Sequence, residues 1–340
     1  MCNARLIHVV NYMPERIIKN DQFLNEILKE NPDLLEDDKL LDNPFFKGVE
    51  QRHFASPDYT SSELGYQVAK KLLNETSTKE TDIDLIVCSC IFTDTYWPGI
   101  GSNIQAKLGA NQAAVINLDT SCCSFLTGLS TAQAFIRSGH YNKVMIISVT
   151  NFISRLDEFQ KSPRSFVLGD GACAALMTKD SVNSIVSSHE QAFGENYGLM
   201  RFEPDLVDGY FYNYWQRSCG PITVNFDKKS LDKIRDNALK IVPNMLEICL
   251  IKANMKIEEI NCLITHQPNQ FFIKEWRKTL SMSNERCHDT LKKYGNLFQG
   301  SVAVTLADAF ATKRIKPGDL VAMATFANGG DLGAAIILKT

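Results

Sequence analysis

Residues 113–139 read AAVINLDTSCCSFLTGLSTAQAFIRSG, and this stretch decides the fold. The apolar run at 113–118 predicts a buried strand, and residues 125–137 have helical apolar spacing closed by Gly139. The tight turn between them places Cys122 in the first turn of the helix. Unpaired N–H groups and the helix dipole favour negative charge there, so we expect the pKa of the Cys122 thiol to fall. A catalytic nucleophile requires such a setting.

The composition is that of a soluble globular protein. The 340 residues are enough for one large domain or two medium ones, with 44% hydrophobic and 22% charged residues in the ordinary range. A net charge of −3 gives no reason to expect a nucleic acid or a membrane surface as partner. We see no apolar run of membrane-spanning length and no signal-peptide pattern at the N-terminus.

The ten cysteines are predicted to be reduced. Most lie in apolar, strand-like segments rather than at the loop spacings of a disulfide framework, which indicates a cytoplasmic protein. The pairs Cys88/Cys90 and Cys122/Cys123 lack zinc-ligand spacing, and no C-x-x-C is present. We therefore expect no metal site.

An α/β unit occurs twice along the chain. Each copy contains an amphipathic helix, an acidic turn, an apolar strand, a second helix, a second strand, and a glycine turn before a last strand. The first copy is predicted at 62–73, 83–88, 122–137, 144–148 and 169–176, and the second at 231–253, 260–265, 296–313, 320–325 and 329–338.

Strands as apolar as these suit sheets that are covered on both faces. We predict a duplicated α/β fold with five α-β-α-β-α layers, in which residues 1–177 form the first half and 178–340 the second. Equivalent loops would meet near a pseudo-twofold axis. The elbow of the first half carries Cys122, the matching position of the second carries Asn296, and a strand of the second half ends at His266. The duplication predicts that these side chains converge.

Motifs from one end of the chain to the other share the pattern of a known family. They are IDLIV at 83–87, QAKLGA at 105–110, CCSFLTGL at 122–129, GDGA at 169–172, HQPN at 266–269, YGN at 294–296 and IKPG at 315–318. In this order they resemble the β-ketoacyl-acyl-carrier-protein synthase III branch of the thiolase-fold enzymes.

The resemblance implies a triad of Cys122, His266 and Asn296. Cys122 would take an acyl group from a thioester, and the other two would hold the enolate left when a malonyl unit loses CO2. Imidazole and carboxamide N–H groups are suitable donors to such an enolate in a dry site. The backbone N–H of Cys122 and one from the Asn328-Gly329 turn would form the oxyanion hole.

The same resemblance implies no bound cofactor. The acyl donor would be acyl-coenzyme A or an acyl carrier protein, the acceptor a malonyl-type or other small molecule, and the assembly a homodimer. Cys123 is interpreted as structural, because Phe125 and Gly128 align Cys122 with the family's nucleophile. Gly169-Asp170-Gly171 is interpreted as a structural turn, since no Lys-Ser/Thr follows it as in a phosphate loop.

Aromatic residues are the candidates for substrate binding. Phe92 and Trp97 follow the strand at 83–88, in a loop that in this family shapes the acyl pocket and the dimer interface. Phe211 belongs to the aromatic cluster at 210–215, for which packing and substrate contact both stay open.

The donor entrance departs from the family pattern. Phe46, Ser162 and Phe271 stand where members that accept coenzyme A usually have arginines, so phosphate partners are lost. The acidic stretch at 26–42 precedes the same entrance. Cations that could compensate are Lys47, Arg52, Lys274 and Arg277. We predict altered donor recognition and a role in specialised metabolism.

Three functions are compatible with this sequence. The first is decarboxylative condensation through an acyl-Cys122 intermediate, which the presence of Asn296 favours. The second is acyl transfer to a small nucleophile with His266 as general base, which the altered entrance favours. The third is a non-catalytic partner subunit, which an intact triad disfavours.

Overall fold

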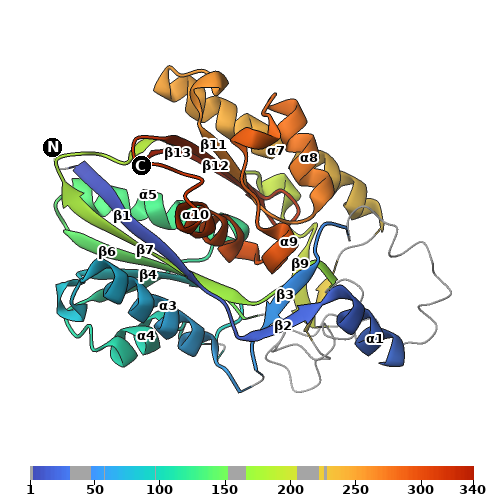
Figure 1. The fold of residues 1–340 in the computed structure, drawn as a ribbon, viewed down its shortest axis with the longest axis horizontal. Helices are drawn as coiled ribbons and strands as arrows, with labels where there is room; N and C mark the ends of the chain where they lie inside the picture. The colour runs from blue at the N-terminus through green and yellow to red at the C-terminus, as the bar shows by residue number, and fades with distance from the viewer. Residues whose placement is uncertain are drawn as a thin grey trace.

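Two central sheets with helices between and outside them make up the protein (Figure 1). The computed structural model describes residues 3–30, 47–56, 58–95, 97–151, 166–204, 222–225 and 228–340. Within this part of the chain, no helix is both long and apolar enough to cross a membrane.

The first sheet has the strand order β1-β7-β6-β4-β5. Its strands are β1 Asn3–Tyr12, β4 Leu85–Cys90, β5 Ala114–Asn117, β6 Lys143–Thr150 and β7 Gly171–Asp180. β4 runs parallel to β5 and β6, whereas β7 is antiparallel to β6 and β1. β5 is only partly buried, contrary to the prediction of a buried strand, because it lies at the sheet edge and pairs on one side.

The second sheet repeats this arrangement in the order β11-β12-β13-β8. Its strands are β8 Ile185–Ala192, β11 Cys262–Thr265, β12 Leu320–Ala327 and β13 Leu332–Lys339. β11 is parallel to β12, and β13 is antiparallel to β12 and β8. The relations are those of β4, β6, β7 and β1, so the predicted duplication is confirmed at the level of strand order. The division at 177/178 remains a prediction, and β7 spans it.

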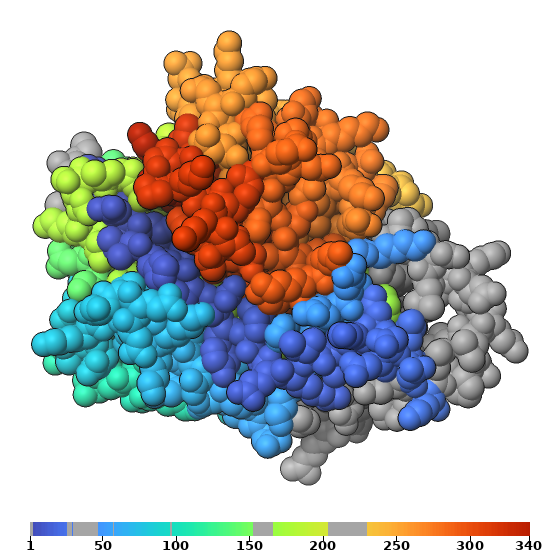
Figure 2. Space-filling model, in the orientation of Figure 1, coloured from blue at the N-terminus to red at the C-terminus, as the bar shows by residue number. Residues whose placement is uncertain are grey.

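Helices complete the five predicted layers. α3 Ser61–Thr76 and α4 Gly101–Leu108 cover the outer face of the first sheet, and α7 Lys228–Ala253 and α8 Gln270–Thr279 cover that of the second. α5 Ser124–Arg137 and α10 Ser301–Ala311 contact both sheets from between them. Figure 2 shows the second half, orange to red, lying directly against the first half, blue to green.

Shorter elements lie near one end of the sheets. They are β2 Arg16–Lys19, α1 Asn20–Glu30, β3 Gln51–Phe54, β9 Arg201–Pro204, β10 Ile222–Asn225 and α9 Leu291–Tyr294. β2 pairs with β3, and β9 with β10, in two small antiparallel ribbons.

The duplication extends to the turn that starts each central helix. The 3-10 helix η4, Ser121–Cys123, leads into α5, and η10, Phe298–Gly300, leads into α10. Their first residues have the same left-handed backbone, with φ of 48° and 44°. Position by position, Gln299 is therefore the counterpart of Cys122. The prediction that Asn296 occupies the matching position is wrong, because Asn296 lies two residues before η10 and outside the helix.

Candidate active site

Strand β12 forms hydrogen bonds with the backbone at both Cys122 and His266. The side chain of Thr325 donates to the Cys122 carbonyl over 3.2 Å, and the His266 N–H donates to the Ala324 carbonyl over 3.0 Å. Two neighbouring residues of β12, Thr325 and Ala324, therefore bind the turn that carries Cys122 and the end of β11. Cys122 is 4% exposed and His266 is 3% exposed.

The HQPN motif has a local structural role as well as carrying His266. Asn269 caps α8 by accepting a hydrogen bond from the Phe272 N–H over 3.0 Å. The buried Gln267 donates to the Thr265 carbonyl and accepts from the N–H groups of Thr290 and Leu291. It thus joins the end of β11 to α9, the helix that leads to Asn296. Sequence reasoning missed this function of Gln267, although the motif itself was visible.

His266 is a neutral imidazole. Burial lowers its pKa to about 3, because a charged ring would lose its hydration. Among the described residues, its Nδ1 atom has no hydrogen-bond partner. Phe326 packs edge-on against the ring, with centroids 6.0 Å apart. The ring is therefore enclosed by apolar surface and has nitrogen capacity left for a ligand.

Asn296 is fixed by its carbonyl end. Its side-chain oxygen accepts from the Phe298 N–H over 2.9 Å and from the Ser301 hydroxyl over 3.2 Å. Its backbone pairs with the first half, donating to the Val167 carbonyl and accepting from Gly169. Within the described residues, no hydrogen bond uses the nitrogen of its side-chain amide. The side-chain NH2 group is therefore the end left to bind a ligand.

η10, which follows Asn296 after one residue, packs against η4, which carries Cys122. The structure thus brings the elements bearing all three predicted residues to one place.

The Cys122 thiol does not have the lowered pKa that the sequence suggested. Burial raises it to about 12, although hydrogen bonds from the Ser121 side chain and the Asn328 backbone lower it. The expectation was wrong because the sulfur is enclosed, and the cost of burying a thiolate exceeds the stabilisation by the helix terminus. Cys122 is therefore a thiol in the resting protein. Burial also raises the pKa of Cys123 well above the usual range.

The predicted oxyanion loop is the turn between β12 and β13. Asn328 has a φ of 47° there, a left-handed conformation that asparagine tolerates better than most residues. Asn237 donates to the Gly329 carbonyl and Asn196 to the Gly330 carbonyl, each over 2.9 Å. A side chain on Gly329 would collide with Leu199, whose Cβ lies 2.4 Å from the position of the added carbon. The loop is therefore held in place even though Asn328 stands where the family has glycine.

Among the predicted substrate-binding residues that the structure describes, Phe92 is joined to η10 by ring contacts. It contacts Phe202 with ring centroids 5.4 Å apart, and Phe202 contacts Phe298 of η10 at 6.0 Å. Trp97 is 86% exposed and not buried in this core. Phe271 packs on Phe272 outside the second sheet. Phe46 and Phe211 lie outside the described residues.

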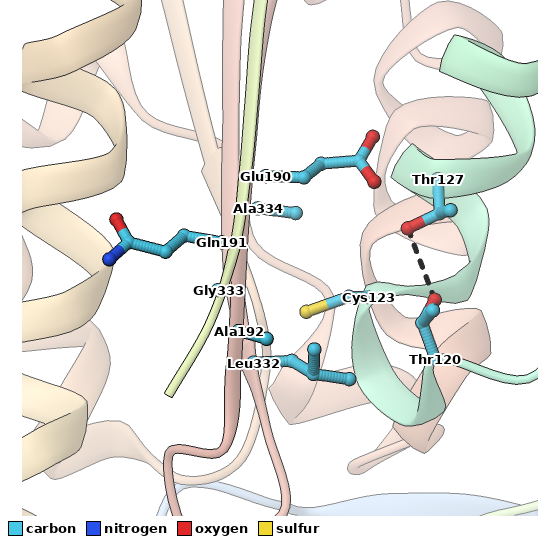
Figure 3. A pocket seen from close by; sticks show the side chains of 9 residues that line it. All are labelled: Thr120, Cys123, Thr127, Glu190, Gln191, Ala192, Leu332, Gly333 and Ala334. Atoms are coloured by element: carbon cyan, nitrogen blue, oxygen red, sulfur yellow. Dashed lines mark hydrogen bonds between the residues drawn. The ribbon is translucent and has the colours of Figure 1, made fainter. Parts of the chain in front are cut away.

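A cavity of about 160 Å³ lies behind the nucleophile turn (Figure 3). Its lining comprises Thr120, Cys123, Thr127, Glu190, Gln191, Ala192, Leu332, Gly333 and Ala334. The Thr120 hydroxyl donates to that of Thr127 over 3.1 Å, and the Cys123 sulfur points toward the strands of the second sheet. The cavity borders Cys123, and neither Cys122 nor Phe92 lines it.

The cations that could replace the missing arginines differ in their surroundings. Arg52 is completely buried between the rings of Phe23 and Phe166 and donates to the Phe166 carbonyl, so it holds the fold and not a phosphate. Arg277 forms an ion pair with Asp289. Lys47 and Lys274 are exposed. Ser162 lies outside the described residues. Within the described residues, no group of three or more His, Cys, Asp or Glu side chains could hold a metal ion.

Comparisons with known proteins agree with this architecture. Residues 116–194 match the family model 3-oxoacyl-[acyl-carrier-protein] synthase III, and residues 250–339 match the model of its C-terminal part. The β-ketoacyl-[acyl-carrier-protein] synthase III of Campylobacter jejuni is 29% identical over 343 residues, which cover 99% of this chain and 98% of the relative.

Solved structures share the fold at lower identity. The β-ketoacyl-[acyl-carrier-protein] synthase III of Thermus thermophilus has a TM-score of 0.83 with 22% identity, covering 98% of both chains. OleA of Xanthomonas campestris, crystallised with lauric acid and lauroyl-CoA, has a TM-score of 0.82 with 17% identity, covering 99% of both chains.

The fold is that of the thiolase-fold proteins. Over nearly its whole length, and in the two matched segments above all, the chain is similar to the β-ketoacyl-acyl-carrier-protein synthase III enzymes.

Proposed function

We propose that this protein is a decarboxylative condensing enzyme working through an acyl-Cys122 intermediate. The first half, residues 1–177, supplies the nucleophile, and the second, residues 178–340, supplies His266 and Asn296. The orientation of the Asn296 amide carries this proposal. Its oxygen is occupied by Phe298 and Ser301, so its NH2 group is the end available to a substrate oxygen.

In the first step, Cys122 attacks an acyl thioester of coenzyme A or an acyl carrier protein. A carbon–sulfur bond forms to Cys122, the bond to the donor sulfur breaks, and the thiol proton leaves with the departing thiolate. The backbone N–H groups of Cys122 and Asn328 are proposed to hold the oxyanion, with Gly329 completing the turn. Such preorganised donors lower the barrier most in a dry site.

In the second step, a malonyl-type acceptor loses CO2 and leaves an enolate. Its carbon attacks the acyl-Cys122 carbonyl, the new carbon–carbon bond forms, and the bond between the acyl carbon and the Cys122 sulfur breaks. The released Cys122 thiolate then takes up a proton from water. His266 and Asn296 would donate hydrogen bonds to the enolate oxygen. A neutral imidazole suits that task, because it can donate without giving up its proton.

The acyl chain is proposed to lie against the ring series Phe92, Phe202 and Phe298, which is apolar and ends at η10, the turn that packs against η4. The exposed Trp97 would complete the pocket of a second subunit in a homodimer. Phe46 and Phe271 would border the donor entrance, and Phe211 would contact the acyl chain. Phe271 in place of an arginine supports altered donor recognition and a role in specialised metabolism. Equal and efficient turnover of acetyl-coenzyme A with malonyl-acyl-carrier-protein would contradict that role.

Simple acyl transfer to a small nucleophile is the second candidate, supported by the same altered entrance. It requires His266 as general base, and an imidazole whose pKa is about 3 is a weak base at neutral pH. A non-catalytic partner subunit is the third candidate.

The experiment is to measure CO2 released from a malonyl thioester by the wild-type protein and by His266→Ala and Asn296→Ala. Condensation predicts release in the wild type and a loss of about 100-fold or more in both variants. An acyl-enzyme that transfers its group without releasing CO2 would support the second candidate instead. If neither CO2 release nor an acyl adduct were found, the non-catalytic partner subunit would be the remaining candidate.

A further inference from the structure

The hydroxyl of Ser121 lies between two acceptors. It is 2.9 Å from the side-chain oxygen of Asn328 and 3.9 Å from the sulfur of Cys122. A hydroxyl carries one proton, which it gives to one acceptor in a well-formed bond. The contact with Asn328 has the usual length of an O–H···O bond, whereas the contact with sulfur is long. The Ser121 proton is therefore directed mainly at Asn328, and the longer contact gives the sulfur only a weak donor.

The carboxamide of Asn328 is anchored so that its oxygen stays turned toward Ser121. Its NH2 group donates to both carboxylate oxygens of Asp331, over 3.2 and 3.0 Å. The carbonyl of Asp331 in turn accepts from the Phe193 N–H over 2.7 Å. Because the two ends of an amide are fixed relative to each other, the bond to Asp331 sets the direction of the oxygen.

Withholding this proton affects the charge state of Cys122. A thiolate gains from a nearby hydroxyl donor, and a hydrogen bond to a charged acceptor is stronger than one between neutral groups. A Ser121 hydroxyl engaged by Asn328 gives the thiolate less of that stabilisation.

We propose that Asn328 is a positioning residue that limits the reactivity of Cys122 by holding the Ser121 hydroxyl proton away from the sulfur. A glycine, which the family has in this loop, has no such acceptor. The inference deepens the proposed function, since it concerns the nucleophile named there. Its test needs no acyl donor, so the two can fail separately.

The titratable groups around the sulfur are the same in the variants that test this. Asp331 in the β12–β13 turn and the neighbouring Cys123 act on the sulfur directly. Asp119 before η4 acts on Asp331, and Glu190 in β8 acts on Cys123. Asn328 itself is uncharged. Removing its side chain frees the Ser121 proton and also leaves the Asp331 carboxylate without its amide donor. A double variant separates these effects.

The experiment measures the rate at which iodoacetamide alkylates Cys122, mapped by peptide mass, from about pH 6 to about pH 10. Asn328→Gly adopts the same left-handed backbone without strain. We expect it to react roughly three- to tenfold faster than the wild type near pH 8, with its profile shifted to lower pH. The double variant Ser121→Ala/Asn328→Gly should return to within about twofold of the wild type.

Two single variants complete the test. Asn237→Ala removes the bond to the Gly329 carbonyl in the same loop without touching Ser121, and it should change the rate by less than about twofold. Ser121→Ala leaves the turn at Asn328 intact and should change the rate by less than about twofold, because the long contact from Ser121 gives the sulfur little stabilisation.

Several results would overturn the proposal: no acceleration in Asn328→Gly, an acceleration that persists in the double variant, an equal acceleration in Asn237→Ala, or a large slowing in Ser121→Ala. Lack of Cys122 reaction in every variant would also overturn it, because freeing the proton would then have no effect. Alkylation as expected, combined with no acyl adduct from any thioester, would instead contradict the proposed function and leave this inference standing.

Discussion

The side chain of Thr325 donates a hydrogen bond to the backbone carbonyl of Cys122 over 3.2 Å, joining residues 203 positions apart in the chain. Thr325 is completely buried. This bond fixes the nucleophile turn on the strand to which the end of β11 is also attached. The same hydroxyl also lies 3.2 Å from the Phe326 carbonyl, so it contributes to holding the turn of Cys122 against β12 together with the packing of η4.

Replacing Thr325 with valine keeps the shape of the side chain and removes the donor. We expect the free energy of unfolding to fall by about 1–3 kcal/mol, because a buried carbonyl loses its partner, and acylation of Cys122 to slow by about tenfold or more. Denaturant unfolding and single-turnover acylation measure the two effects. Thr76→Val removes a similar bond, from Thr76 to the Leu72 carbonyl in the outer helix α3, and should affect stability alone. Equal loss of activity in both variants would contradict the role of Thr325.

The amide of Asn296 gives a second prediction. Asn296→Asp keeps an oxygen for Phe298 and Ser301 but replaces the NH2 donor with a carboxylate oxygen that repels an enolate. CO2 release from a malonyl thioester should fall at least about 100-fold, while acylation of Cys122 changes by less than about threefold. Asn183→Asp, at an amide that binds the Ile185 carbonyl far from the site, is the matched control. Loss of acylation together with decarboxylation would count against an enolate-binding role.

The pH dependence of the reaction tests the charge state of His266. Its pKa of about 3 means that the imidazole is already neutral at pH 5 and stays neutral at higher pH. We therefore expect kcat for CO2 release to show no acid limb near pH 6.5 between about pH 5 and about pH 8. A halving of kcat near pH 6.5 that disappears in His266→Gln would show that the ring titrates normally and acts as a base.

The nearly buried carboxylate of Asp308 in α10 contributes to the acid stability. Asp308 accepts hydrogen bonds from Lys293 over 3.0 Å and from the Tyr294 hydroxyl over 3.1 Å, and it contacts His288 at 3.0 Å. Burial raises its pKa, but the bonds to His288 and Lys293 outweigh burial and bring it to about 2. The ordinary value is 3.8, so the folded state binds this proton more weakly than the unfolded state does.

The sign of the effect follows. Asp308 stabilises the fold above pH 3.8, and this contribution is lost as the pH falls toward 2. Asp308→Asn should lower the free energy of unfolding by about 2 kcal/mol near pH 6, with the difference from wild type vanishing at acid pH. Denaturant titrations of both proteins give the difference curve, in which the contribution of His266 cancels. Glu75→Gln, at an exposed contact with His8, should change the free energy by less than about 1 kcal/mol. A difference independent of pH would refute the assignment to Asp308.

Much of the fold was predictable because the strands are uniformly apolar and recur in the same order. The helix at residues 125–137 was found nearly to the residue, since Gly139 and the apolar spacing mark it. The start of the second central helix, α10, was not predictable, because it is preceded by the 3-10 turn η10, whose first residue, Phe298, has a left-handed backbone. A positive φ at phenylalanine has no signature in sequence.

The candidate site was predictable in its residue types but not in its electrostatics. The pKa of Cys122 depends on how much protein encloses the sulfur, and local sequence says nothing of that. Ser121, Asn328 and Asp331 were likewise not recognisable as a unit, because the bond between the first two spans 207 residues. Asn328 was seen only as a departure from glycine.

The most direct test of the whole account is intact-mass analysis after incubation with a series of acyl-coenzyme A thioesters. We predict one acyl adduct in the wild-type protein, the same adduct in Cys123→Ala, and none in Cys122→Ala. An adduct that persists in Cys122→Ala and disappears in Cys123→Ala would contradict the account.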